Sequence, residues 1–522
     1  MATTLITGRP WRVILLFSVP LLIGNVVQQL YQFVDTIVVG RQLGVDSLAA
    51  VGATGSLIFL IIGFAWGLAS GFAIPTAQAF GAGDARGVSR SVATGTLLTG
   101  VTSLILTVLG PLIARPFLEL LQTPSELLAE ATTFTQVTFI GGSTIMFFNY
   151  LAAIIRAIGD STTPLVFLTI SCGLNVGLVI LMVGPLGWGV AGAALATVIA
   201  QAISVLLCLG YLWRKLPVLH VHRDDWRVRR ADALEHLRLG LPMGFQASII
   251  AIGALAVQVA LNTLGADAVA AYTAASRIDG LAVALLASLG LASSMYAAQN
   301  LGARRPDRIR RGTVQALWMA IATSVLLGVI MIAFGASVVR LFVGDESERV
   351  VDLAHQMLII NGVSYAALGV LFVLRGVLQG VGRVAIPTIT GVVELVARVI
   401  AAVALGAVWD FAGVALSNPL AWIGAVVILV PAYLSAHRAF SRMPVEPIET
   451  TLTTPIPVIG PTEGSRMVDA VFTAPAPVVV GRLSALRLPR RGGGRAERAR
   501  APVREGGRSA SGCEPFTCHP SG

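Results

Sequence analysis

Charged residues are scarce in this sequence. Asp, Glu, Lys and Arg make up 12% of the 522 residues, whereas hydrophobic residues make up 55%. Soluble globular domains carry about 25% charged residues, so an ordinary soluble domain is excluded. Cysteine is also rare, with four residues and no histidine partner at metal-ligand spacing. The sequence therefore predicts neither a disulfide framework nor a metal site built on cysteine.

Motifs of the common enzyme classes are missing as well. We find no His, Asp or Glu cluster at metal-ligand spacing, no P-loop and no serine elbow, so we expect neither an enzyme nor a cofactor. The net charge is +10, but the basic residues lie between apolar runs and in the C-terminal tail. This placement indicates membrane topology rather than nucleic-acid binding.

What the sequence has is a series of apolar runs, each about long enough to span a bilayer as a helix. The first run is too long and too polar at its end for a signal peptide and has no small-residue cleavage site, which favours an uncleaved span. The sequence thus predicts an all-α, polytopic membrane protein of twelve transmembrane helices. The runs cover approximately residues 11–40, 47–80, 92–113, 130–155, 165–183, 190–213, 240–264, 268–298, 313–334, 351–374, 387–408 and 413–436.

Composition divides the chain into four parts. Residues 214–238 are polar and basic, and we interpret them as a cytoplasmic linker between an N-terminal lobe, 1–213, and a C-terminal lobe, 239–440. Residues 441–522 are rich in Pro, Gly, Ser, Thr and Arg and predict a disordered cytoplasmic tail, solvated rather than bound to anionic lipid. Most basic connections fall on one side, so the positive-inside rule places both termini in the cytoplasm of a plasma (inner) membrane protein.

The two lobes repeat one sequence pattern. Residues 77–82 match residues 298–303, and residues 43–50 match residues 264–271, both at an offset of 298 − 77 = 221. Each lobe holds six spans, an even number, so both enter the membrane in the same direction. We therefore expect two parallel lobes, related by a pseudo-two-fold axis along the membrane normal, in a V shape with a central cleft. That architecture suits transport by alternating access.

Asp35 is an acid near the end of the first apolar run. A carboxylate in a spanning helix costs roughly 2.5–3.5 kcal/mol on insertion scales. Membrane proteins that keep such a group commonly move protons or ions with it. A structural aspartate, bonded to the backbone of neighbouring helices, is the alternative.

The chain resembles the multidrug and toxic compound extrusion (MATE) transporters over about residues 10–440. The resemblance rests on the first helix with Pro20 and Asp35, two Leu-Gly-x-Asp turns, two Ala-Gln-x-x-Gly-Ala segments, Gly159-Asp160 before Pro164, and residues 192–197. It implies a secondary antiporter that exports small organic, often cationic amphipathic, compounds in exchange for H⁺ or Na⁺. We expect a monomer surrounded by membrane lipids.

The resemblance also implies an ion-coupling site in the N-lobe at Asp35, Asn175 and Thr197. Where the family has a second acid, this chain has Val179. A hard cation prefers several oxygen ligands, and losing a charged one weakens a Na⁺ site more than a proton site. We therefore favour H⁺, and Na⁺ held by the same three residues is the alternative.

The C-lobe contains further charges within apolar runs. Asp279 lies in one run, and Glu394 and Arg398 form an i, i+4 pair in another. One interpretation is a structural ion-pair network that includes Arg375. The other is contact with a cationic substrate or a proton relay. Further polar residues either line the cleft or bond between helices, namely Gln32, Asn149 and Gln201.

A lipid-linked saccharide flippase of the same superfamily is the nearest alternative function. Such flippases often line the cavity with several cations that bind a pyrophosphate. Here the first lobe carries an acid with amides, which favours a cationic cargo.

Overall fold

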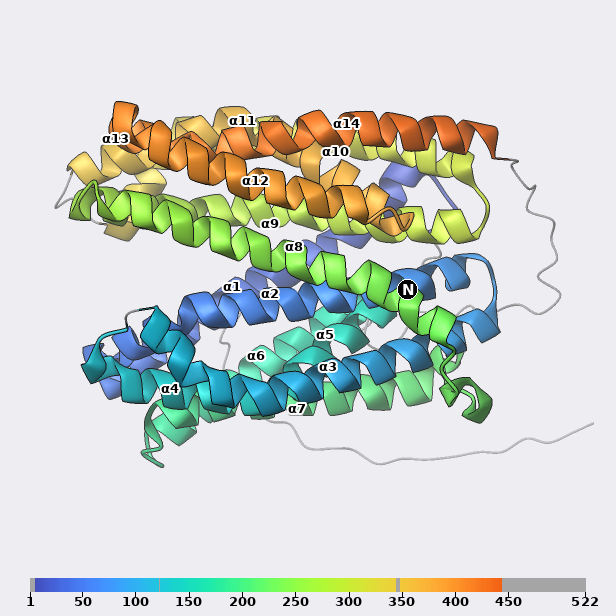
Figure 1. Ribbon diagram of the computed structural model, residues 1–522, viewed down its shortest axis with the longest axis horizontal. Helices are drawn as coiled ribbons and strands as arrows, with labels where there is room; N and C mark the ends of the chain where they lie inside the picture. The colour runs from blue at the N-terminus through green and yellow to red at the C-terminus, as the bar shows by residue number, and fades with distance from the viewer. Residues whose placement is uncertain (1–4, 122, 344–347, 444–522) are drawn as a thin grey trace, which may run out of the picture. The chain divides into compact units, whose positions relative to one another are not determined.

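The computed structural model describes residues 5–121, 123–343 and 348–443, which fall in one compact unit. Beyond Met443, the predicted tail lies outside the described residues. The first half contains seven α-helices (Figure 1): α1 (Pro10–Leu43), α2 (Val45–Gly81), α3 (Ala85–Leu120), α4 (Ser125–Ile140), α5 (Gly142–Ala157), α6 (Thr162–Val183) and α7 (Gly189–Lys215).

The second half follows two short 3₁₀ turns, η1 (Pro217–Leu219) and η2 (Arg223–Trp226). Its first helix begins at Arg230, within the stretch 214–238 that the sequence assigns to the linker, so residues 216–229 connect the helices of the two halves. The helices of this half are α8 (Arg230–Asn262), α9 (Ala266–Gly302), α10 (Pro306–Val343), α11 (Glu348–Gly380), α12 (Ala385–Ala404), α13 (Gly406–Ala415) and α14 (Ser417–Arg442).

Eleven described helices are long and apolar enough to cross a bilayer, and the pair α4 and α5, bent by 48°, makes up to twelve. The span expected at 130–155 is therefore broken near Gly141. By contrast, the prolines inside two other spans do not break them, since α1 continues through Pro20 and α2 through Pro75. Helices satisfy their own backbone hydrogen bonds, which lipid cannot do, and this explains why the described spans are helical.

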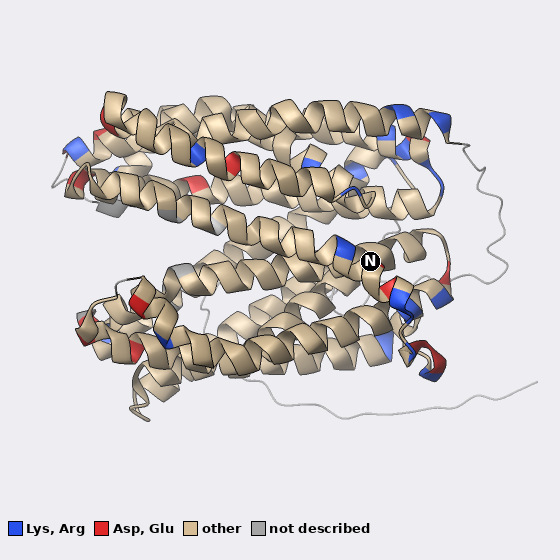
Figure 2. Ribbon diagram, in the orientation of Figure 1, with Lys and Arg blue, Asp and Glu red and all other residues tan. Residues whose placement is uncertain are grey.

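Lys and Arg gather at one end of the helices (Figure 2), which we call the basic end. Acidic residues at the opposite end include Asp46, Glu126 and Asp267. The basic end is defined by Arg86, Arg90, Arg156, Lys215, Arg304 and Arg383.

The internal repeat reappears in the backbone. Helices α2 and α9 both have 37 residues and start at the offset of the sequence match, 266 − 45 = 221. Gly44 and Gly265, which precede them, have φ angles of 91° and 94°. The turns after them also match, since Gly83 has φ 70° and Arg304, 221 positions later, has φ 51°. The duplicated turn places an arginine in a conformation that favours glycine.

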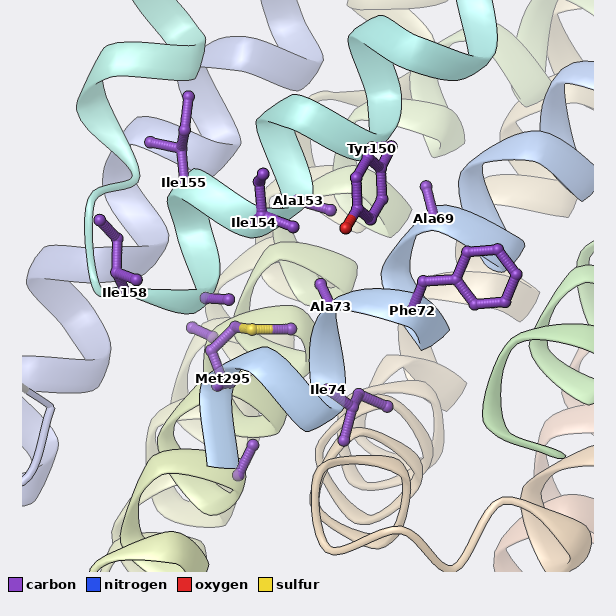
Figure 3. Close-up of a cluster of buried hydrophobic side chains, with 14 of the residues drawn as sticks. Ala69, Phe72, Ala73, Ile74, Tyr150, Ala153, Ile154, Ile155, Ile158 and Met295 are labelled. Atoms are coloured by element: carbon purple, nitrogen blue, oxygen red, sulfur yellow. The ribbon is translucent and has the colours of Figure 1, made fainter. Parts of the chain in front are cut away.

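Helix α2 lies at the centre of the largest buried cluster (Figure 3). Ala69, Phe72 and Ala73 of α2 lie in the same cluster as Tyr150 and Ile154, and Met295 joins them from α9. Phe72, Ala73 and Ile154 have no exposed surface. The core of the N-lobe is therefore continuous with the contact between the two lobes.

The lobes meet through glycines. Gly67 and Gly71 of α2 face Gly240 and Gly244 of α8, and a Cβ atom at Gly71 would lie 2.5 Å from the Cα of Gly240. A Cβ atom at Gly67 would overlap the carbonyl of Met243. Small residues at this spacing let two helix backbones approach closely.

Two glutamines bond across the same contact in equivalent ways. Gln78 Nε2 donates to the carbonyl of Gly380 at 2.9 Å, at the end of α11 in the other lobe. Gln299 Nε2 donates to the carbonyl of Ala157 at 2.7 Å, at the end of α5. Each lobe thus hydrogen-bonds the last turn of a helix in the other.

The chain before α1 strengthens this contact. The backbone N–H of Leu5 donates to Gln299 Oε1 at 3.0 Å, and Asn300 Nδ2 donates to the Leu5 carbonyl at 3.2 Å. Arg308 Nη1 donates to the carbonyl of Gly8 at 3.0 Å. The start of the N-lobe is therefore held by side chains of the C-lobe.

Candidate functional site

Thr197 of α7 is the centre of a polar cluster in the N-lobe. Its Oγ1 accepts a hydrogen bond from Tyr31 Oη at 2.9 Å and another from Asn175 Nδ2 at 3.1 Å. Its own proton is donated to the carbonyl of Ala193 at 3.3 Å. A hydroxyl has two acceptor lone pairs and one donor, so every hydrogen-bonding position of Thr197 is occupied.

Asn175 of α6 keeps one free acceptor. The residue is 1% exposed, and its Oδ1 has no hydrogen-bond partner among the described residues. Val179 lies one turn further along α6, at the position where the family has a second acid, and it is fully buried. An unsatisfied buried carbonyl oxygen is costly, and it suits a group that brings a proton or a positive charge.

The side chains of Gln32 and Asp35 lie outside the described residues. Their backbone belongs to α1, in which position 35 follows Tyr31 by four residues. Residues four apart lie on the same helix face, one turn from each other. Position 35 is therefore on the face of α1 that meets Thr197 through Tyr31.

The C-lobe has its own polar cluster around Asp279 of α9. Asp279 is 7% exposed, and its Oδ1 accepts hydrogen bonds from Tyr365 Oη at 2.6 Å and from Asn361 Nδ2 at 3.1 Å. Both donors come from α11, four residues apart, so one helix face supplies them. The sequence analysis did not identify Tyr365. Its position four residues after Asn361, on the same helix face, is the pattern that could have identified it.

Glu394 forms its ion pair with Arg375 of α11, and both are buried. The expected i, i+4 pair with Arg398 does not form. Instead the Arg398 guanidinium lies by Gly253 of α8, and its buried Nε has no hydrogen-bond partner among the described residues. Two buried arginines compete for Glu394, and the one on the neighbouring helix is paired.

The remaining polar candidates show no hydrogen bond to these clusters among the described residues. Asn149 donates to the carbonyl of Ile145 on its own helix at 2.8 Å. Gln201 lies one turn after Thr197, and its buried Oε1 has no partner among the described residues. A bridge between C-lobe helices was missed: Gln379 Nε2 donates to Gln246 Oε1 at 2.8 Å. In the described part of the chain, no three His, Cys, Asp or Glu residues come together as a metal site.

Comparison with known families gives one match that occurs twice. The MatE family model matches residues 20–181 and residues 242–404. The two matches start 242 − 20 = 222 positions apart, close to the offset of the internal repeat. Each half of the chain thus matches the family on its own.

Individual proteins agree with this match. A probable multidrug resistance protein, YoeA of Bacillus subtilis, is 30% identical over 392 residues, which is 73% of this chain and 84% of that protein. The FAD transporter of Shewanella oneidensis is 23% identical over 403 residues, 76% of this chain and 88% of that protein. Among solved structures, MATE in a bent conformation gives a TM-score of 0.78 at 23% identity, covering 84% of this chain and 97% of that one.

Proposed function

The chain belongs to the MatE family of multidrug efflux transporters, and from that premise we propose that it is a proton-coupled antiporter. It exports small organic, often cationic, compounds by alternating access of a cleft between its lobes. The observation that carries this proposal is the cluster of Tyr31, Asn175 and Thr197 on the same side of α1 as position 35. Asp35 binds the coupling ion there.

The hydrogen bonds of Thr197 support H⁺ over Na⁺. Both lone pairs of its Oγ1 accept hydrogen bonds, so it has none left for a metal ion. Of the three ligands that the resemblance implies, with Val179 in place of an acid, Asp35 and the Oδ1 of Asn175 remain. Two protein oxygens are few for a hard cation, whereas a single carboxyl group is enough to bind a proton.

Alternating access is supported by where the lobes touch. Hydrogen bonds and close glycine contacts join the lobes from the basic end as far as Gln29, Leu60, Ser248 and Gly280. Beyond these points α1, α2, α8 and α9 each continue for several turns. We assign the basic end to the cytoplasm by the positive-inside rule. When the glycine contacts separate, the cleft opens toward the cytoplasm.

In the C-lobe we assign different roles to the two acids. Glu394 is paired with Arg375 and has a structural role. Only Oδ1 of Asp279 accepts a hydrogen bond from described residues, so its second oxygen is available to a cationic substrate. The pairing of Arg375 also counts against a flippase, because a neutralised arginine binds a pyrophosphate poorly.

The coupling ion is tested in proteoliposomes that hold the full chain and a cationic dye. Dye movement is followed under an imposed pH gradient and, separately, under an imposed Na⁺ gradient. We expect the pH gradient alone to drive transport. Transport driven by the Na⁺ gradient alone would replace H⁺ by Na⁺, and no dye movement under either gradient would contradict the antiporter assignment.

A further inference from the structure

A charged pocket lies at the basic end, between the start of α3 and the connection from α7 to α8. Its volume is about 570 Å³. In Figure 2, basic and acidic segments gather where the chain passes from α7 to α8. Four arginines contribute to the lining, two from α3 and two from the connection: Arg86, Arg90, Arg227 and Arg229.

These arginines have no ionic partner among the described residues. Two of the three aspartates in the lining are engaged elsewhere. Asp84 Oδ1 caps α3 by accepting from the backbone N–H of Gly87 at 2.8 Å, and Asp225 Oδ2 accepts from the Ser89 hydroxyl at 2.6 Å. The third, Asp224, is exposed. With four arginines and three aspartates, the lining has a net charge of 4 − 3 = +1.

Arg90 gives a second, independent sign of a ligand. The residue is half-buried, and its Nε is buried without a hydrogen-bond partner among the described residues. Leaving a buried donor of a charged group unsatisfied is unfavourable. An oxyanion in the pocket would satisfy it, because a guanidinium matches a phosphate in geometry and charge.

We place the pocket near the outer edge of the lipid headgroup layer. Leu97 and Val101 of α3 are 41% and 57% exposed, as expected of side chains that face lipid. Leu97 follows Arg90 by seven residues, which is about 10 Å along a helix. The headgroup layer is roughly 5–8 Å deep on each side of the hydrocarbon core. Exposed Trp226 lies in the chain between two lining residues, Asp225 and Arg227, and tryptophan is enriched at this interface.

We propose that this pocket binds the phosphate group of an anionic phospholipid. Arg86 and Arg90 hold the phosphate from α3, and Arg227 and Arg229 close over it from the connection. Because this connection joins the two lobes, the bound lipid ties it to the N-lobe at the membrane surface. A phospholipid headgroup and free inorganic phosphate both carry the phosphate that these arginines would bind, so free phosphate is the alternative ligand.

The test is the melting temperature of the full chain in detergent with added phosphatidylglycerol, phosphatidylcholine, or inorganic phosphate. We expect a saturable rise with phosphatidylglycerol only, and its loss in the double variant Arg86→Gln/Arg90→Gln. The control Arg311→Gln/Arg438→Gln removes the same charge from exposed positions in the C-lobe and should keep the rise. If the α3 variant does not fold, Arg227→Gln/Arg229→Gln replaces it.

Three outcomes overturn the proposal. An equal rise with inorganic phosphate assigns the pocket to a soluble phosphate instead of a lipid. A rise that persists in both pocket variants places the lipid elsewhere. A rise that is lost in the control as well as in the pocket variants reduces the effect to net surface charge.

Discussion

The two lobes repeat one pattern of helices but differ in their buried polar groups. Asn175 follows the first residue of α6 by 13 positions, and Arg398 follows the first residue of α12 by 13, so an amide in one lobe corresponds to a guanidinium in the other. The described side chains of the N-lobe cluster, Tyr31, Asn175 and Thr197, are uncharged. The C-lobe holds Arg375, Arg398, Asp279 and Glu394. A duplicated scaffold can therefore keep its turns and helix contacts while its buried polar groups diverge.

This difference predicts a division of labour. In our proposal the N-lobe binds the proton at Asp35, whereas the C-lobe carries buried charges that must compensate one another.

Breaking the ion pair between Arg375 and Glu394 in the C-lobe should cause the largest loss of stability. Arg375→Met leaves Glu394 buried without its partner, which destabilises a protein by about 3–5 kcal/mol. The double variant Arg375→Met/Glu394→Gln removes the stranded charge and should recover much of the loss. The melting temperature in detergent measures both. A single variant as stable as the parent would mean that Arg398 takes over as the partner of Glu394.

The glycine contacts between the lobes should be nearly as sensitive. A Cβ atom at Gly81 would overlap the carbonyl of Gln299, and one at Gly302 would overlap that of Gln78. Gly81→Ala and Gly302→Ala should therefore both separate the lobes at the basic end, which is measured by labelling of a cysteine introduced at the buried position Ala77 or Ala298. Gly52→Ala is the matched control on α2, because nothing lies within 4 Å of that position. Unchanged labelling in both variants would contradict closure by these contacts.

The two equivalent glutamines should differ in effect. Gln299 bonds both Ala157 and Leu5, whereas Gln78 has one described bond across the lobes. Each lost hydrogen bond costs about 0.5–1.5 kcal/mol. Gln299→Ala should thus destabilise the closed basic end about twice as much as Gln78→Ala in the same labelling assay. Equal effects would show that the chain before α1 contributes nothing to closure.

Tyr31→Phe should have the smallest effect on transport. It tests whether the occupied lone pairs of Thr197 are what disfavour Na⁺. It frees one lone pair of Thr197 without removing Asn175 or Asp35. We expect transport to remain driven by the pH gradient and a weak response to Na⁺ to appear in proteoliposomes. A complete loss of transport would instead assign the Tyr31 hydroxyl a direct part in moving the proton.

Much of this architecture follows from the sequence. Apolar run lengths predict the spans, and the offset between residues 77–82 and 298–303 predicts the repeated helices. The bend at Gly141 could not be predicted, because no proline lies at that position. It occurs where Val198 of α7 packs against the glycine. The partner of Glu394 could not be predicted either, because the nearest arginine in the sequence is not the nearest one in space. Contacts between distant helices decide such pairings, and spacing within one helix does not reveal them.

The most direct test of the divided roles compares Asp35→Asn with Asp279→Asn. Both are purified in folded form and assayed for dye transport under an imposed pH gradient. The account predicts that Asp35→Asn abolishes transport driven by the pH gradient but still binds dye, and that Asp279→Asn weakens dye binding but keeps the response to pH. Transport by Asp35→Asn at the parental rate would contradict coupling in the N-lobe.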